Sequence, residues 1–510
     1  MNALQRTNMK RQLNRTSLSN RKAGVAAVVV PLVAALLLSG CAVGPDYRAP
    51  HADVPAQWSG GKSAPEANGA QAAERPDLRQ WWVHLSDPLL DTLIEEAVSG
   101  NLDVATAAAR VREARAVVRQ AGGALYPSLN GTAAFTRSGA GSHAVTTTSS
   151  SAGASTSVLG VGSPANLFQA GFDASWEIDI FGGNRRSLEA AQGGLDAAQW
   201  DLRSTLLTLV GDVATHYVEA RGYQARLALA RATADSQQET ARLTRIRFVA
   251  GSNSGLDAAN ASGEAQSTLA TIPALEAAYA QSVHSLAVLL GRAPGALLAS
   301  MERAQDVPVP PLPVMLGVPA DVLLARPDVR AAERRYAQST ARVGQAEAAR
   351  YPRVTLTGTL STSGTQFGDL ARHSSIGWSI GPAVTIPLFD AGRLKAAVEI
   401  ADAQRDQSFI AYRSAVLTAL QDVENASVSL SRETERVQNL KRSADAYGDA
   451  AAMAQSLYRS GSTGFLEVLT AERSLYAAQD TLIQSRVLIA TDFIALNKAL
   501  GGGWDGAEAD

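Results

Sequence analysis

The chain has 510 residues, of which 46% are hydrophobic, and its 46 basic and 48 acidic residues give a net charge of −2. No basic patch stands out, which argues against a nucleic-acid partner. Cys41 is the only cysteine, so the chain cannot form an internal disulfide or a multi-thiolate metal site.

The first predicted element is a leader that ends just before Cys41. Six basic residues and no acidic residue precede the apolar run "AGVAAVVVPLVAALLL" and two small residues, Ser39 and Gly40. This layout is typical of a secretory signal peptide, since the run of about 16 residues is shorter than the roughly 20 of a membrane-spanning helix. Without the 40 residues ahead of Cys41, which hold the six basic residues, the net charge becomes −8.

The motif "LSGC" at the end of this leader resembles a bacterial lipobox. The resemblance implies that the sulfur of Cys41 is acylated, and Ala42 in the next position fits sorting to the outer membrane. Several acyl chains hold a protein on a bilayer, because each buried CH₂ contributes about 0.8 kcal/mol. The alternative is an incidental cysteine behind an ordinary signal peptide.

The remainder of the chain repeats itself. Identical residues recur 225 positions apart at Asp103 and Asp328 and at Tyr126 and Tyr351, and 210 positions apart at Gly251 and Gly461 and at Leu290 and Leu500. We therefore predict a signal peptide (1–40), an acylated extension (41–86), a first repeat (87–291), a linker (292–320), a second repeat (321–501) and a tail (502–510).

Each repeat has the same predicted elements. An Ala-rich helix ends at Tyr-Pro and is followed by two strands, of which "FQAGFDASWEIDIF" and "SIGWSIGPAVTIPLF" alternate strictly, up to Ile180 and Leu388. "SLNGTAAFTR" and "RVTLTGTLST" are their weaker partners. Alternation over roughly 10 residues is typical of a membrane barrel strand. It also fits a soluble sandwich, but four good strands are few for that fold. The segment from Ser138 to Pro164 is rich in Ser, Gly and Thr, and this composition predicts a mobile loop that lies outside the cell.

A long helix without proline is predicted after each pair of strands, from Asn184 to Phe248 in the first repeat. Apolar residues recur every seven positions from Leu188 to Leu209, and again from Phe409 to Ala444. Sustained heptads predict coiled-coil packing, and each helix spans roughly 90 Å at 1.5 Å per residue. Four strands cannot close a barrel, and open edges in lipid leave unpaired amides. We therefore expect a ring of several chains, in which three chains give twelve strands.

Five stretches carry a specific resemblance. They are "CAVGPDYRAP", "WWVHLSDPLLDTLIEEAVSGNLDVATAAARV", "GVPADVLLARPDVRAAERRYAQSTARVGQAEAARYPRVTLTG", "IPLFDAGRLKAAVE" and "ALGGGW". Together they resemble the TolC-like outer-membrane efflux protein family, lipoprotein (NodT-type) branch. The resemblance implies a mixed α and β fold: a homotrimer with a shared 12-stranded outer-membrane β-barrel and a long α-helical coiled-coil barrel in the periplasm.

The resemblance also implies a function. The chain would be the passive outer-membrane exit duct of a tripartite efflux pump for drugs or other toxic small molecules. Its partners would be a periplasmic adaptor, an inner-membrane resistance-nodulation-division pump and outer-membrane lipid. The alternatives are a duct for type I protein secretion, a periplasmic coiled-coil adaptor and a secreted lipoprotein enzyme. We expect no catalysis and no cofactor besides the lipid on Cys41, and the six histidines show no metal-ligand spacing.

In this family the two helix-turn-helix loops form the periplasmic tip, which contacts the adaptor and closes the duct. The corresponding residues here are Gly251, Leu256 and Asp257 in the first repeat and Gly461, Leu466, Glu467 and Thr470 in the second. Many relatives carry a second acidic residue where this chain has Thr470, so a double acidic ring is in question. We expect packing of Leu256 and Leu466 and hydrogen bonds from nearby arginines (Arg245, Arg459 and Arg473) to hold the closed state. The alternative is that Glu467 is only an exposed carboxylate at a helix start.

Overall fold

The computed structural model describes residues 42–51, 54–55, 58, 78–139, 164–310 and 326–504. Cys41 and most of the loop between the first two strands therefore lie outside the described residues. The chain divides into two compact units, and each unit takes segments from both repeats. The first comprises Met1–Arg48, Arg115–Gly194 and Tyr336–Gln407; the second comprises Ala49–Ala114, Leu195–Arg335 and Ser408–Asp510.

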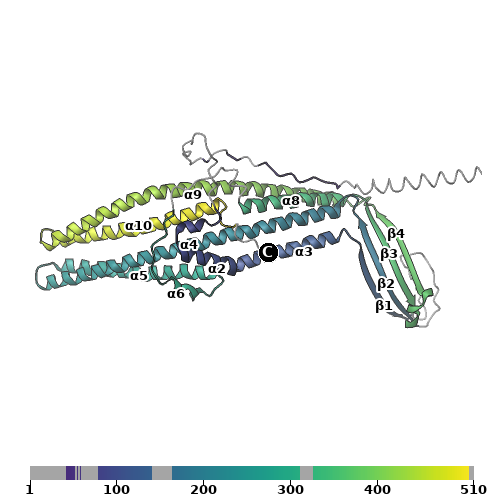
Figure 1. Ribbon diagram of the computed structural model, residues 1–510, viewed down its shortest axis with the longest axis horizontal. Coiled ribbons are helices and arrows are strands. Elements are labelled where there is room, and N and C mark those ends of the chain that lie inside the picture. The colour runs from purple at the N-terminus through teal and green to yellow at the C-terminus, as the bar shows by residue number, and fades with distance from the viewer. Residues whose placement is uncertain are drawn as a thin grey trace, which may run out of the picture. The chain divides into compact units, whose positions relative to one another are not determined.

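The first unit contains an antiparallel sheet of order β1-β2-β3-β4 (Figure 1). Its strands are β1 (Ser128–Ser138), β2 (Ala165–Ile178), β3 (Arg353–Gly364) and β4 (Ile376–Thr385). The register brings the apolar residues of all four strands to one face, where Phe172 lies opposite Leu360 and Leu360 opposite Trp378. In one chain these three side chains are 56%, 47% and 75% exposed. Such a face is stable against lipid, as predicted for barrel strands.

Two strands end earlier than the alternation predicts. β2 ends at Ile178 and not at Ile180, because the amide of Ile180 turns back to the carbonyl of Ile178 at 2.8 Å. β4 ends at Thr385 and not at Leu388, and Pro387 lies in between without an amide hydrogen for a ladder. The connection between β3 and β4 contains two short 3-10 helices, η3 (Phe367–Ala371) and η4 (His373–Ser375).

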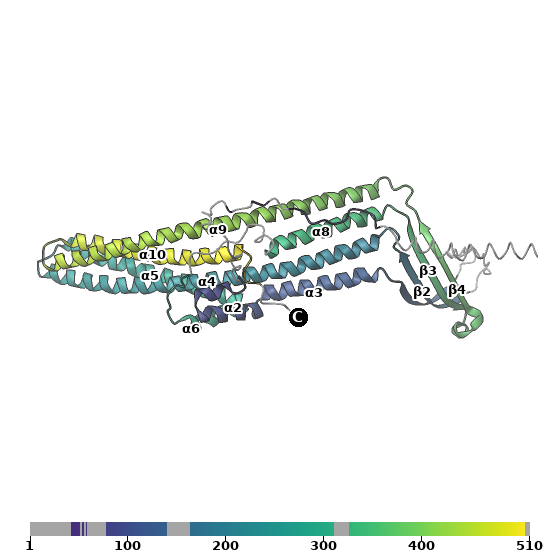
Figure 2. The ribbon, with the colours of Figure 1, turned by 45° about the horizontal axis from the view of Figure 1, so that its top comes forward.

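The helices follow the predicted plan in both repeats. α3 (Leu102–Gly123) precedes β1 and α8 (Pro327–Ala348) precedes β3. Each pair of strands is followed by one helix of 67 residues, α4 (Gly183–Val249) and α9 (Arg393–Arg459). A return helix of 35 residues comes next, α5 (Gly255–Leu289) beside α4 and α10 (Phe465–Ala499) beside α9 (Figure 2). The long helices are continuous, because no proline interrupts either of them.

The main hydrophobic core lies in the second unit. Here η1 (Trp81–Leu85) and α2 (Pro88–Gly100) pack against the long and return helices, and η2 (Pro294–Leu297) and α6 (Leu298–Met301) follow α5. Ile94, Val213 and Leu286 are fully buried in this cluster. Burial of each such side chain contributes roughly 1.5–3 kcal/mol, so the core holds the middle of both long helices in place.

Heptad packing is confirmed in the second repeat, where Val416, Val423 and Leu430 are all buried. In the first unit, small residues bring helices α4 and α8 together. A Cβ on Gly193 would lie 3.1 Å from the Cα of Gln338, so the two helices approach almost backbone to backbone. Close approach of this kind needs glycine or alanine at the contact.

Among the described helices, no single one is both long enough and apolar enough to cross a membrane. Gly255–Leu289 and Pro294–Met301 pass that test only as a pair, with a bend of 107° between them.

Candidate functional site at the helical tip

The turn between α4 and α5 closes the first helical hairpin. Gly251 has φ of 76°, in the left-handed region that favours glycine. The amides of Gly251 and Ser252 donate to the carbonyls of Phe248 and Arg247 at 2.9 and 2.8 Å. These two bonds form a Schellman-type end, which satisfies carbonyls that the last turn of a helix leaves open.

The next helix begins with a reciprocal cap. The amide of Asp257 donates to Ser254 Oγ at 3.0 Å, and the amide of Ser254 donates to Asp257 Oδ2 at 3.2 Å. This capping box satisfies two of the amides that a helix start leaves free. The carboxylate of Asp257, predicted as an acidic group at the tip, is therefore bonded to the start of its own helix.

The turn between α9 and α10 has the same backbone but a different cap. Gly461 has φ of 77°, and the amides of Gly461 and Ser462 donate to the carbonyls of Tyr458 and Leu457 at 3.1 and 2.9 Å. The capping position of α10 is Gly464, which supplies no side chain.

The first turns of α10 hold the remaining predicted residues. Glu467 is the acidic residue of the first turn, and the hydroxyl of Thr470 donates to the carbonyl of Leu466 at 2.8 Å. A Cβ on Gly464 would lie 3.2 Å from Glu467 Oε2, so this carboxylate lies beside its own helix start.

A cleft of about 610 Å³ separates the two turns and is lined by residues of both, including Gly251, Asp257 and Gly461. The side chain of Asn253 donates from Nδ2 to Tyr458 Oη at 2.6 Å across the cleft. The structure therefore brings four predicted residues together at the cleft, Gly251, Asp257, Gly461 and Arg459, and adds two that sequence reasoning missed. No spacing rule pairs Asn253 with Tyr458, because they are 205 positions apart.

Aromatic and cationic groups reinforce this contact. The guanidinium of Arg247 lies 4.8 Å from the ring centroid of Tyr458, and the ring of Phe465 lies 5.8 Å from it. Phe465, Val468 and Leu469 form a small buried cluster with Ala261 just behind the turns. An arginine over an aromatic face contributes roughly 0.5–1 kcal/mol at an exposed site, so the two hairpins are linked at their ends.

The expected leucine packing does not occur within one chain. Leu256 is 69% exposed and Leu466 is 61% exposed, and neither belongs to the small buried cluster. The three arginines also act separately. Arg473 pairs with Glu264 at 3.4 Å, Arg245 lies 5.9 Å from the ring of Phe248, and Arg459 lines the cleft.

One acidic residue behind the tip was also missed. Glu472 accepts from Gln455 Nε2 at 2.8 Å, and burial, together with the nearby charge of Glu264, raises its pKa even though the hydrogen bond from Gln455 lowers it. The described residues contain no cluster of side chains that could hold a metal ion.

Four strands with one lipid-facing side and two long helical hairpins with exposed ends define a subunit of an oligomeric membrane channel. Residues 93–292 and 318–502 match the family model described as "Outer membrane efflux protein", and the chain belongs to this family. The two matched segments contain most of the two repeats.

Individual relatives are similar over nearly the whole length. The chain is 36% identical to Nodulation protein T of Rhizobium leguminosarum bv. trifolii, over 92% of this chain and 96% of the relative. It is 31% identical to the cation efflux system protein CusC of Escherichia coli O6:H1, over 93% and 98%. The solved structure of the outer-membrane channel OprN matches with a TM-score of 0.81 and 32% identity, over 91% of this chain and 100% of that one.

These findings confirm the resemblance seen in the sequence. The chain is the outer-membrane channel component of a tripartite efflux pump, located in the bacterial outer membrane and extending into the periplasm. It has the TolC-like fold, in which three chains share one barrel. Members of the family are transport proteins and not enzymes.

Proposed function

We propose that this channel is a passive exit duct for small toxic molecules, fed by a resistance-nodulation-division pump through a periplasmic adaptor that contacts the two turns. The observation that supports the adaptor contact is the cleft between the turns, flanked by exposed Leu256 and Leu466. Exposed apolar residues around a polar cleft mark an interaction surface. A passive duct has no catalytic task.

The cargo we propose is organic. CusC, one relative, is named for cation efflux, and a relay for soft cations needs several thioether or thiolate ligands. Beyond the leader this chain has only three methionines: Met301, Met315 and Met453. The specificity of a passive duct comes mostly from its pump.

Substitution of the tip leucines tests the adaptor contact. Leu256→Asp combined with Leu466→Asp places charges on the proposed contact, and we expect loss of adaptor cross-linking in cells and loss of drug tolerance. Val309→Asp changes an equally exposed apolar residue in the linker and serves as the control. Normal cross-linking by a double variant that reaches the outer membrane as a trimer would refute the contact.

The gate we propose depends on Glu467. In a trimer the α9–α10 turns supply three copies of this carboxylate, and a ring of negative charge attracts cations. Glu467→Ala in a reconstituted trimer should weaken cation selectivity and reduce block by multivalent cations. If Glu467 only stabilises its helix start, by roughly 0.3–1 kcal/mol, conductance, selectivity and block stay unchanged.

Asp257 provides the matched control for this measurement. Its carboxylate is bonded to the amide of Ser254, so Asp257→Asn should lower the stability of the turn and leave cation selectivity nearly unchanged. Equal loss of selectivity in both variants would show that Glu467 has no special place at the constriction.

The anchor we propose is an acylated Cys41, which lies outside the described residues. Mass spectrometry of protein from outer membranes should detect acyl chains on an N-terminal Cys41, as the "LSGC" motif predicts. An unmodified thiol there would contradict the proposal and leave the channel function intact.

A further inference from the structure

The first described residues pack against the β2–α4 connection, the first turn of α4 and helix α8 in the first unit, and the surface that they contact is called the groove. This segment, residues 42–47, is called the strap. The amide of Val43 donates to the carbonyl of Phe181 at 3.1 Å, in the connection from β2 to α4. Gly182 has φ of 82°, and a Cβ there would lie 2.8 Å from the Cα of Ala42. The strap therefore begins in direct contact with the connection that follows β2.

A buried arginine holds the strap in this groove. Arg186, in the first turn of α4, is 5% exposed. Its Nε donates to the carbonyl of Val43 at 3.2 Å, and Nη2 donates to the carbonyl of Gly44 at 3.3 Å and to Asp46 Oδ1 at 2.7 Å. Nη1 donates to Glu189 Oε2 at 2.8 Å. A buried guanidinium requires partners for its donors, and the strap supplies three of these four bonds.

The two carbonyl contacts matter more than the ion pair. The side chain of Asp46 is 84% exposed, and pairs open to solvent contribute little. The carbonyls of Val43 and Gly44 are fixed by the backbone, and a planar guanidinium can reach both at once. A lysine in place of Arg186 has one compact charge and cannot reproduce this geometry.

Glycine allows the strap to lie flat on α8. A Cβ on Gly44, where φ is 89°, would lie 2.4 Å from the Cα of Gly344. A Cβ on Gly344 would lie 2.9 Å from Arg186 Nε. The edge contact between the rings of Tyr47 and Tyr336, with centroids 5.9 Å apart, completes the groove. The fit therefore depends on both surfaces, the strap and the groove.

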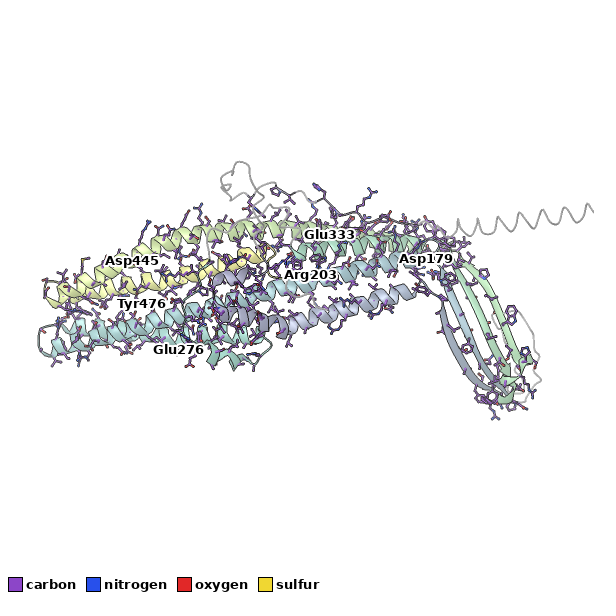
Figure 3. All side chains as sticks on the ribbon, in the orientation of Figure 1. Asp179, Arg203, Glu276, Glu333, Asp445 and Tyr476 are labelled. Carbon is purple, nitrogen blue, oxygen red and sulfur yellow. The ribbon has the colours of Figure 1, made fainter. Side chains whose placement is uncertain are left out.

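The groove lies where the chain leaves the sheet. Asp179, labelled in Figure 3, marks this place, because its carboxylate accepts from the amide of Arg185 at 2.8 Å and so stabilises the start of α4. The sheet is the membrane-spanning part of the channel, and β2 ends at Ile178 on the side where the periplasmic helix begins. A group held here lies at the periplasmic edge of the membrane.

We propose that this groove is the docking site for the acylated N-terminus of the chain, and that Arg186 is the positioning residue that fixes where the acyl anchor enters the membrane. The inference rests on the proposed acylation of Cys41, which is one peptide bond from Ala42. An undocked flexible tether of about 35 residues reaches roughly 30 Å, so it would leave the position of the anchor open. Docking places the anchor beside the end of β2.

Hydrogen exchange on the purified full-length trimer tests the docking. The amides within residues 43–47, of which Pro45 has none, should be protected in the unmodified protein, above all that of Val43, which donates to the carbonyl of Phe181. Arg186→Ala should raise their exchange rate about tenfold to a hundredfold, because bonds to a charged donor are lost. Arg186→Lys should raise it by a smaller factor, and Gly44→Ala should act like Arg186→Ala from the strap side. Arg342→Ala removes an exposed charge on α8 and should leave exchange unchanged.

Residues 213–218 in the core report on global folding. If Arg186→Ala also raises exchange at residues 213–218, this variant is partly unfolded. The exchange of residues 43–47 in Gly44→Ala then decides whether the strap is docked. Unchanged exchange at 43–47 in both variants overturns the docking, and so does an equal rise in Arg342→Ala.

A second measurement follows the anchor itself. A photoreactive fatty acid incorporated biosynthetically should cross-link to peptides that contain the last residues of β2 and the first residues of β3, which pair with each other. In Gly44→Ala these cross-links should spread over other parts of the chain. Undispersed cross-links in a variant with raised exchange would overturn the positioning role. The mass of the N-terminal peptide is read in the same experiment. An unmodified Cys41 with a protected strap would refute acylation and leave the docking intact.

Discussion

The two repeats keep the same lengths but use different side chains at the ends of their helices. The long helices have 67 residues in both repeats and the return helices have 35. Because each helical residue adds the same rise, equal residue counts give the two hairpins the same length along their axes. The side chains that close the helix ends need only satisfy the same backbone groups, so they can differ.

The end of each return helix shows this difference. In the first repeat, Asn101 Nδ2 donates to the carbonyl of Leu289 at 2.8 Å, while its Oδ1 accepts from the amides of Asp103 and Val104. A neutral amide therefore ties the end of α5 to the start of α3.

The second repeat uses a charged group for the same connection. Arg326 Nη1 donates to the carbonyl of Ala499 at 3.2 Å. The same guanidinium pairs with Asp328 at 2.7 Å and with Asp422 at 3.1 Å. A buried cation now depends on two carboxylates, so its removal affects more groups than removal of Asn101.

The largest expected effect therefore comes from Arg326→Ala. Breaking a buried ion pair costs roughly 3–5 kcal/mol, and the partial exposure of Asp328 and Asp422 lowers this to about 2–3 kcal/mol. The measurement is the temperature at which heated trimers dissociate, at one fixed protein concentration.

Asn101→Ala is the matched variant in the other repeat. It removes a neutral cap, which is worth about 1 kcal/mol, and should lower the dissociation temperature less than Arg326→Ala. Equal shifts in the two variants would mean that the charge at position 326 adds nothing to the connection.

The sequence predicted this shared framework well, because heptads, alternation and the repeat separation are local or periodic patterns. It placed Gly251 and Gly461 in the turns, where left-handed backbone needs glycine. It did not predict that Asp257 would cap its own helix, nor that Asn253 would reach Tyr458. Those contacts depend on how two distant hairpins meet, and Leu388 was assigned to a strand because alternation alone does not show where pairing stops.

A second comparison concerns the interior of the return helices. Asp492 lies 210 positions after Ser282, at the corresponding place in the second repeat. Burial, with a smaller contribution from the nearby charge of Glu433, raises the pKa of Asp492 to about 6. The folded protein therefore binds this proton more tightly than the unfolded chain does. The stabilisation grows as pH falls from about 6 towards 4 and is lost as pH rises through about 6.

Asp492→Asn should remove this pH dependence and make the second repeat resemble the first. At pH near 7 we expect a gain of about 1 kcal/mol, a value reduced for the partial exposure of the carboxyl group to water. The check is the dissociation temperature of trimers across pH 4 to 7. Asp445→Asn, at an exposed position on α9, is the control and should leave the profile unchanged (Figure 3). If the stability of Asp492→Asn still falls between pH 4 and 6 as it does in the unmodified protein, that fall belongs to other groups.

The smallest expected effect lies at the tip, where Ser254 caps α5 and Gly464 occupies the same position before α10. Gly464 has φ of −81° and ψ of 168°, an extended conformation that suits a serine at a helix start. Gly464→Ser would create the sequence Ser-Phe-Leu-Glu, a capping box in which Glu467 bonds back to residue 464.

The gain in stability from Gly464→Ser is only about 0.3 kcal/mol, because glycine is already a fair capping residue. Ser254→Gly should lose a similar amount in the first repeat. The informative readout is the channel current. A Glu467 carboxylate held by its own backbone is less available to cations, so Gly464→Ser should weaken cation selectivity in the same direction as Glu467→Ala, while Ser254→Gly should not. If Gly464→Ser stabilises the tip and selectivity is unchanged, the carboxylate of Glu467 does not act on passing ions, and the difference between the two turns concerns stability alone.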